Sequence, residues 1–141
     1  MSKKDVKEKQ IEMELSFIEM NDFYNSILHL GSLPLRDLDL MINVSKTKNI
    51  VKSEYDLYNE MYKIITEESC LKDSNGKPIL VEGKSFQYKD KKEELSVLSS
   101  IDELKNKKVV ITITPFNVNK LEGIEGITAN MLSSLNKMII Y

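Results

Sequence analysis

Hydrophobic and polar residues alternate near the start of the chain, where four apolar side chains are separated by glutamate or serine. These apolar positions are Ile11, Met13, Leu15 and Phe17. A period of two is typical of a strand with one buried face, so the pattern predicts a strand over residues 11–17. A helix of about ten residues should follow, capped by Asn21 or Asp22 and ended by Gly31.

The next pattern is the longest in the chain, because neither glycine nor proline occurs between Leu35 and Ser69. It predicts a helix of up to about 35 residues, with a break near residues 45–49 left open. Two apolar strips adjoin on this helix. The first contains Val44, Val51, Tyr55, Tyr58, Tyr62 and Ile65, and the second contains Ile50, Leu57, Met61 and Ile64. A surface helix normally buries one stripe, so we expect one strip to pack on the sheet and the other to meet a second copy or a partner protein.

Turn-forming residues mark the middle of the chain. The segment 73–78, Asp-Ser-Asn-Gly-Lys-Pro, predicts a turn. Residues 79–82 and 85–88 flank a Gly-Lys pair and predict a small hairpin.

Shorter elements are expected in the last third of the chain. Residues 91–98 have a helical pattern, and Ser100 with Glu103 has the spacing of a capping box, which predicts a second short helix. Alternation over residues 109–114 predicts the clearest strand, and Thr128 should cap a terminal helix.

Together these patterns predict an α+β fold, in which a small antiparallel or mixed sheet packs against one long helix and several short helices. The length of 141 residues fits one domain. We expect a charged N-terminal leader over residues 1–10 and a single domain over residues 11–141. The leader lacks the apolar core of a signal peptide and no apolar run is long enough to span a bilayer, which predicts a cytoplasmic protein without a membrane partner.

Charge composition argues against nucleic acid as the partner. The formal net charge is −2, which is too small to steer the chain toward phosphate. Arg36 is the only arginine among the twenty basic residues, and arginine is the residue that reads phosphates and guanine edges with two parallel hydrogen bonds.

Residues for catalysis or metal binding are scarce. His29 is the only histidine and Cys70 the only cysteine. A Ser-His-Asp or Cys-His arrangement would have to use His29, which stands near the end of a predicted helix, where histidine is usually a surface residue. A zinc site needs three or four ligands. The sequence therefore predicts no catalytic residues, no metal site, no cofactor and no enzymatic activity.

Three tyrosines on the long helix are the candidate partner-binding residues: Tyr55, Tyr58 and Tyr62. They occupy positions i, i+3 and i+7 and therefore lie on one stripe. Such a stripe most often belongs to the core. Tyrosine also combines a large apolar area with a polar tip and is favoured at interfaces, so contact with a partner is the functional alternative.

The order of elements resembles that of a group of short bacteriophage proteins of unassigned function. The similarity covers roughly residues 10–140 and includes the turn at residues 73–78, the glycine-containing hairpin and the strand ending at Pro115. It implies a viral origin and a place in the host cytoplasm or the virion. The expected function is a stoichiometric inhibitor of a host defence factor, with a virion structural or assembly accessory as the alternative. The expected partner is thus a host or phage protein, and a homo-oligomer is left open.

Overall fold

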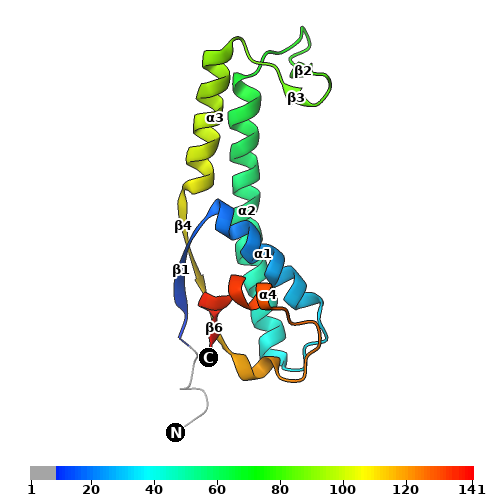
Figure 1. Cartoon of the computed structure of the whole chain (residues 1–141), viewed down its shortest axis with the longest axis vertical. Helices are drawn as coiled ribbons and strands as arrows, with labels where there is room; N and C mark the ends of the chain where they lie inside the picture. Colours follow the sequence, from blue (N-terminus) through cyan, green and yellow to red (C-terminus); the bar gives the residue numbers. More distant parts are fainter. Residues whose placement is uncertain (1–8) are drawn as a thin grey trace. The chain divides into compact units, whose positions relative to one another are not determined.

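The computed structural model describes residues 9–141, in which four α-helices alternate with short strands and 3-10 turns (Figure 1). In chain order the elements are β1 (Ile11–Ser16), α1 (Phe17–Ser32), α2 (Leu38–Ser69), β2 (Leu80–Val81), β3 (Ser85–Phe86), α3 (Lys91–Asn106), β4 (Lys108–Ile113), β5 (Phe116–Asn117), η2 (Val118–Leu121), α4 (Ala129–Ser134), η3 (Asn136–Met138) and β6 (Ile139–Ile140). The α+β class is confirmed, and the strands form two-stranded sheets. The predicted leader, residues 1–10, lies almost wholly outside the described residues.

The described chain forms two compact units. The α/β unit contains the residues up to Tyr55 together with residues 108–141, and the helical unit contains Asp56–Lys107. Helix α2 contributes its first part to the α/β unit and its last part to the helical unit. The single domain expected over residues 11–141 stays a prediction.

The sheet of the α/β unit is the antiparallel pair β1–β4, in register from Ile11 opposite Ile113 to Ser16 opposite Lys108. Side chains alternate between the two faces as the sequence predicts. The inward residues are Met13, Leu15, Ile111 and Ile113, and all are buried. Both predicted strands are therefore confirmed to within one residue at each end.

Helix α1 begins at Phe17, four residues before the first of the caps expected at Asn21 and Asp22, so that expectation is wrong. The cap is Ser16, whose hydroxyl oxygen accepts a hydrogen bond from the Glu19 backbone N–H at 3.1 Å. The Glu19 carboxylate accepts a bond in return from the Ser16 backbone N–H, also at 3.1 Å. This reciprocal pair satisfies two N–H groups that the first turn of a helix would otherwise leave unpaired.

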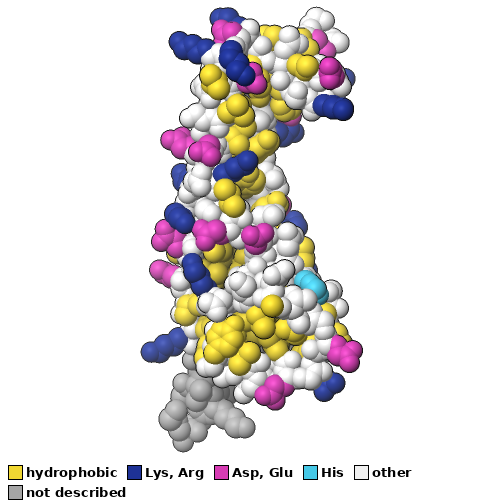
Figure 2. Space-filling model, viewed as in Figure 1, with side chains coloured by type: hydrophobic (Ala, Val, Ile, Leu, Met, Phe, Trp, Pro, Cys, Tyr) yellow, Lys and Arg dark blue, Asp and Glu magenta, His cyan; other side chains and the backbone are white. Residues whose placement is uncertain are grey.

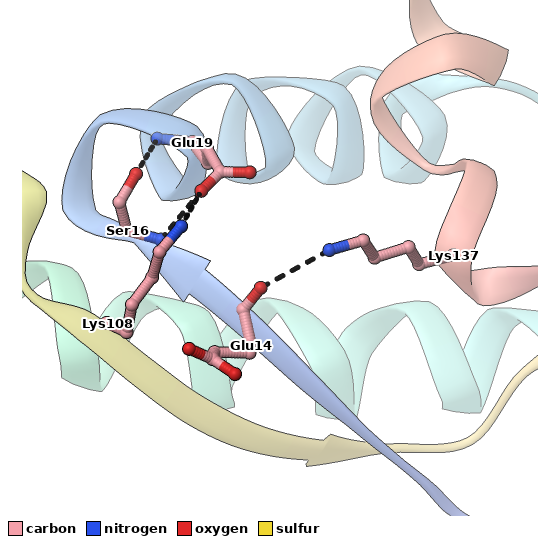
Figure 3. A network of polar contacts seen from close by, with 5 residues as sticks. All are labelled: Glu14, Ser16, Glu19, Lys108 and Lys137. Carbon is pink, nitrogen blue, oxygen red and sulfur yellow. Dashed lines mark hydrogen bonds and ion pairs between the residues drawn. The ribbon is translucent and has the colours of Figure 1, made fainter.

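The Glu19 carboxylate also joins α1 to the start of β4 (Figure 3). The Lys108 Nζ donates to Glu19 Oε1 at 2.9 Å. The hydrogen bond from Lys108, followed by those from the Ser16 backbone and hydroxyl, lowers the pKa of Glu19 from 4.5 to about 2. The charged form of Glu19 is thus favoured in the folded protein.

We predict that Glu19→Gln destabilises the fold at neutral pH and does so less in acid. A carboxyl group whose pKa is lowered by folding stabilises the fold above its unfolded pKa, and that contribution disappears as the pH falls from 4.5 toward 2. Urea unfolding of both proteins at pH 7 and pH 3 measures the effect. A difference in unfolding free energy that is the same at both pH values would contradict this role of the charge.

Helix α2 is continuous through residues 45–49, which settles the break that the sequence left open. Its first turn is held by Asp37, whose carboxylate accepts a hydrogen bond from the Leu40 backbone N–H at 2.8 Å. This bond, together with nearby Lys120, lowers the pKa of Asp37. Further along, Asn43 Nδ2 donates to the Thr114 carbonyl at 2.8 Å and so ties α2 to the end of β4.

The C-terminal segment completes the interior of the α/β unit. Thr128 caps α4 as predicted, since its hydroxyl oxygen accepts from the Met131 backbone N–H at 3.2 Å. Strands β5 and β6 pair in parallel, with Phe116 opposite Ile139. The side chains contributed to the core by this segment include Phe116, Met131, Leu135 and Met138.

The helical unit contains the last part of α2, the β2–β3 hairpin and α3. Helix α3 is one helix, capped by Asp90, so the short helix expected to begin at Ser100 is wrong. The hairpin is confirmed, with shorter strands than predicted. Its turn is centred on Glu82 and Gly83, both with positive φ, and is closed by a hydrogen bond from the Lys84 N–H to the Val81 carbonyl.

Candidate binding surface

The interior of the helical unit is small. Its buried apolar side chains are Cys70, Val97 and Ile101, and Thr66 is buried with them. Tyr88 is half-buried beside this cluster, with its hydroxyl 3.5 Å from the Thr66 carbonyl. Burial raises the pKa of Tyr88, and Cys70, Tyr62 and Glu94 add to the shift.

An apolar strip on α2 remains outside this interior. Leu57, Met61 and Ile64 have the helical spacing i, i+4 and i+7 and therefore occupy one face. All three are exposed, Leu57 by 47% of its surface. Ile50 belongs to the same strip one heptad earlier, in the α/β unit, and it is exposed too. Of the two strips recognised in the sequence, the one through Ile50, Leu57, Met61 and Ile64 is thus exposed in the described chain.

Further apolar side chains of the helical unit are exposed that the sequence analysis did not single out. They are Leu71, Leu80, Val81, Leu95 and Leu98. Leu95 and Leu98 lie on α3, out of phase with the buried pair Val97 and Ile101, and are more than half exposed (54% and 52%). A helical projection of the whole of α3 would have revealed them. Figure 2 shows hydrophobic side chains along the region of α2 and α3, bordered by charged ones.

The three candidate tyrosines have different surroundings. Tyr55 is half-buried in the α/β unit, where its ring stacks on Tyr24 with centroids 5.6 Å apart and its hydroxyl donates to Asn21 Oδ1 at 3.0 Å. Tyr58 and Tyr62 lie in the helical unit with ring centroids 6.2 Å apart. Tyr58 is half-buried and Tyr62 is 39% exposed. Neither ring of this pair is fully buried, so their contact with a partner stays a prediction.

Acidic residues border the strip. Within the helical unit, α2 carries four carboxylates and a single lysine: Asp56, Glu60, Glu67, Glu68 and Lys63. Glu60 and Glu67 stand four residues before and three residues after Ile64, so they lie beside it on the helix surface. The surface is therefore an apolar strip with an acidic border.

The two residues considered for catalysis and metal binding, His29 and Cys70, belong to different units. His29 is exposed in the α/β unit, and Cys70 is buried in the helical unit with its Sγ donating to the Glu67 carbonyl at 3.1 Å. Over residues 9–141 no three side chains of histidine, cysteine, aspartate or glutamate come close enough to share a metal ion.

A hollow of about 890 Å³ lies within the helical unit, between Ile65 and the C-terminal half of α3. Its polar lining residues are Ser99, Ser100, Asp102, Glu103, Asn106 and Lys107. Asp102 accepts from Asn106 Nδ2 at 3.4 Å. In the part of the chain that is described, no hydrogen bond joins either serine hydroxyl to a carboxylate.

No family model matches the chain, and neither does any curated protein or solved structure. Among the helices described, none has the combination of length and hydropathy needed to span a membrane. Function must therefore be inferred from the surface described above.

Proposed function

We propose that the protein is a non-enzymatic binding module whose helical unit docks onto another protein. One observation carries the proposal: this unit exposes more large apolar side chains than it buries. Nine are exposed, namely Leu57, Met61, Tyr62, Ile64, Leu71, Leu80, Val81, Leu95 and Leu98, against buried Cys70, Val97 and Ile101. Apolar surface of this extent is typical of a contact that a partner covers.

The acidic border of the strip defines the chemistry of the partner. Two copies meeting face to face through α2 would bring Glu60 and Glu67 of each near those of the other, and like charges oppose such pairing. A partner that presents apolar side chains bordered by lysine or arginine satisfies both features of the strip. The same acidic excess disfavours nucleic acid, whose phosphates are negatively charged.

In its most concrete form the module is a phage-encoded stoichiometric inhibitor of a host defence factor. The resemblance to short bacteriophage proteins supports this form and equally supports a virion structural or assembly accessory. The two forms differ in the partner, which is a host enzyme in one and a capsid or tail protein in the other. Trapping that partner on the strip therefore tests the general proposal and separates the two forms.

We predict that a photo-crosslinking amino acid at position 61 captures a protein in infected host cells. Met61 lies in the middle of the exposed strip, so a partner that covers the strip must come within reach of this side chain. Mass spectrometry of the covalent adduct identifies the partner. A basic surface on that partner, bordering an apolar one, is the expected result.

The matched control places the same crosslinker at Leu28. This residue is exposed to a similar extent (40%, against 38% for Met61), but it belongs to the α/β unit and not to the proposed docking surface. Equal capture at positions 28 and 61 would indicate collisions without docking. No protein adduct at position 61, or an adduct with nucleic acid alone, would refute the proposed function.

A further inference from the structure

Three hydrogen bonds show in which direction the backbone N–H and C=O groups of β1 and β4 point. The Glu14 carbonyl accepts from Lys137 Nζ at 3.3 Å, and the Ser16 N–H donates to Glu19, both on the side of β1 that faces away from β4 (Figure 3). In an antiparallel pair the N–H and C=O of one residue point to the same side, and facing residues alternate between pairs bonded to each other and pairs that point outward. Glu14 faces Val110, and Ser16 faces Lys108.

It follows that the even-numbered residues of β4 direct their backbone groups away from β1. The Thr114 carbonyl, two residues beyond Thr112, agrees with this assignment, because it accepts from Asn43 of α2 and not from β1. Lys108, Val110 and Thr112 therefore line the outer edge of β4 with N–H and C=O groups.

The two outer edges of the sheet differ in how they are protected. On β1, Lys137 and Glu19 occupy the outward groups of Glu14 and Ser16. On β4, no residue between 9 and 141 forms a hydrogen bond with the outward backbone groups of Val110 or Thr112. An unpaired edge is a template for another strand, and proteins usually guard such edges with proline, a bulge or inward charge.

The side chains of β4 do not guard its edge. The strand sequence Lys-Val-Val-Ile-Thr-Ile contains no proline, and its single charge is at the first position. Lys108 already pairs with Glu19. Val110 is 57% exposed at the centre of the edge. The open segment thus has high strand propensity, an exposed apolar centre and unpaired backbone groups.

We propose that this edge pairs with the same edge of a second copy, antiparallel, with Val110 opposite Val110 of the partner subunit. A two-fold axis through this pair places Lys108 opposite Thr112 of the partner subunit, so no like charges face each other. Each facing pair of outward residues exchanges two hydrogen bonds. The register keeps pairing within residues 108–112, clear of the Thr114 carbonyl that Asn43 occupies. The product is a four-stranded sheet in the order β1–β4–β4–β1.

A second copy fits this edge for a reason of symmetry. A two-fold contact joins the same patch of both subunits and needs a self-complementary surface. The edge meets that condition, since an exposed valine meets its equivalent and a lysine meets a threonine. The contact uses the α/β unit, whereas the proposed function places docking on the helical unit, so the two proposals are independent.

Disulfide trapping tests the register. In a Cys70→Ser background, Val110→Cys should form a disulfide-linked dimer under mild oxidation, because residues facing each other in a hydrogen-bonded pair have Cα atoms about 5.5 Å apart, within disulfide range. Thr112→Cys in the same background is the matched control. The two copies of position 112 are offset by four residues, or about 13 Å along the strands, and should not cross-link.

Sedimentation equilibrium of the unmodified full chain supplies the second measurement. A dimer is expected at about 0.1 mM, and Val110→Lys should give a monomer with an unchanged circular dichroism spectrum, because charge on an edge strand blocks pairing. A monomeric wild type, a dimer that survives Val110→Lys, or cross-linking at position 112 without cross-linking at 110 would each overturn the proposal.

Discussion

Phe23→Ala is expected to lower the free energy of unfolding by about 3–5 kcal/mol, the largest effect of any single substitution considered for this chain. Phe23 is 1% exposed and lies at the centre of the buried face of α1. Met20 and Ile27 are its neighbours on that face, one turn before and one turn after, and neither has measurable exposure. Removing the ring therefore loses its transfer free energy and leaves a cavity lined by side chains that cannot all move in to fill it.

Urea unfolding followed by circular dichroism measures this loss. Leu28→Ala on the same helix is the matched control, because Leu28 is exposed and should change the stability by no more than about 0.5 kcal/mol. A loss below about 1 kcal/mol for Phe23→Ala would show that the interior of the α/β unit is not packed around this ring.

The strands were predictable because the pattern that indicates them lies within each strand. Alternation of apolar and polar residues over 11–17 and 109–114 indicates which side chains face inward, and a shift by one residue would reverse the two faces. The turn at residues 73–78 was predictable for a similar reason. Asp73 accepts hydrogen bonds from the backbone N–H groups of Asn75 and Lys77 within the turn itself.

Helix starts were harder to predict, as two occurrences of the same motif show. Ser16 with Glu19 and Ser100 with Glu103 both have the spacing of a capping box, yet only the first is one. The residue before Ser16 is a buried residue of a strand, whereas Val97 and Ile101 continue one buried helical face across Ser100. The two cases differ in the pattern of apolar residues on either side of the motif. That pattern extends over more residues than the motif itself.

The candidate surface was only partly predictable from the sequence. The strip through Leu57 and Met61 followed from the period of one helix. The stack of Tyr55 on Tyr24 depends on how α1 and α2 meet, which a pattern along one helix does not contain. The exposure of Leu95 and Leu98 depends on which face of α3 is buried. Because a second helix was wrongly expected to begin at Ser100, the buried face that continues from Val97 to Ile101 was not recognised.

The double substitution Tyr58→Ser and Tyr62→Ser is expected to weaken binding of the partner by about 2 kcal/mol or more. Two neighbouring aromatic rings that are only partly covered within the chain offer apolar area that a partner can bury, together with hydroxyl groups that can form hydrogen bonds at the rim. Because neither ring is fully buried, the variant should keep the circular dichroism spectrum of the wild type. Loss of the fold would instead place the pair in the core.

The central claim is that the helical unit carries a protein-binding surface, and a calorimetric titration tests it most directly. The protein captured at position 61 is titrated with the wild type, with the tyrosine double variant and with Leu28→Ala, an exposed position of the α/β unit, as the control. The account predicts that the double variant raises the dissociation constant by about 30-fold or more, while Leu28→Ala leaves it unchanged. A dissociation constant that is the same for all three folded proteins would contradict the claim.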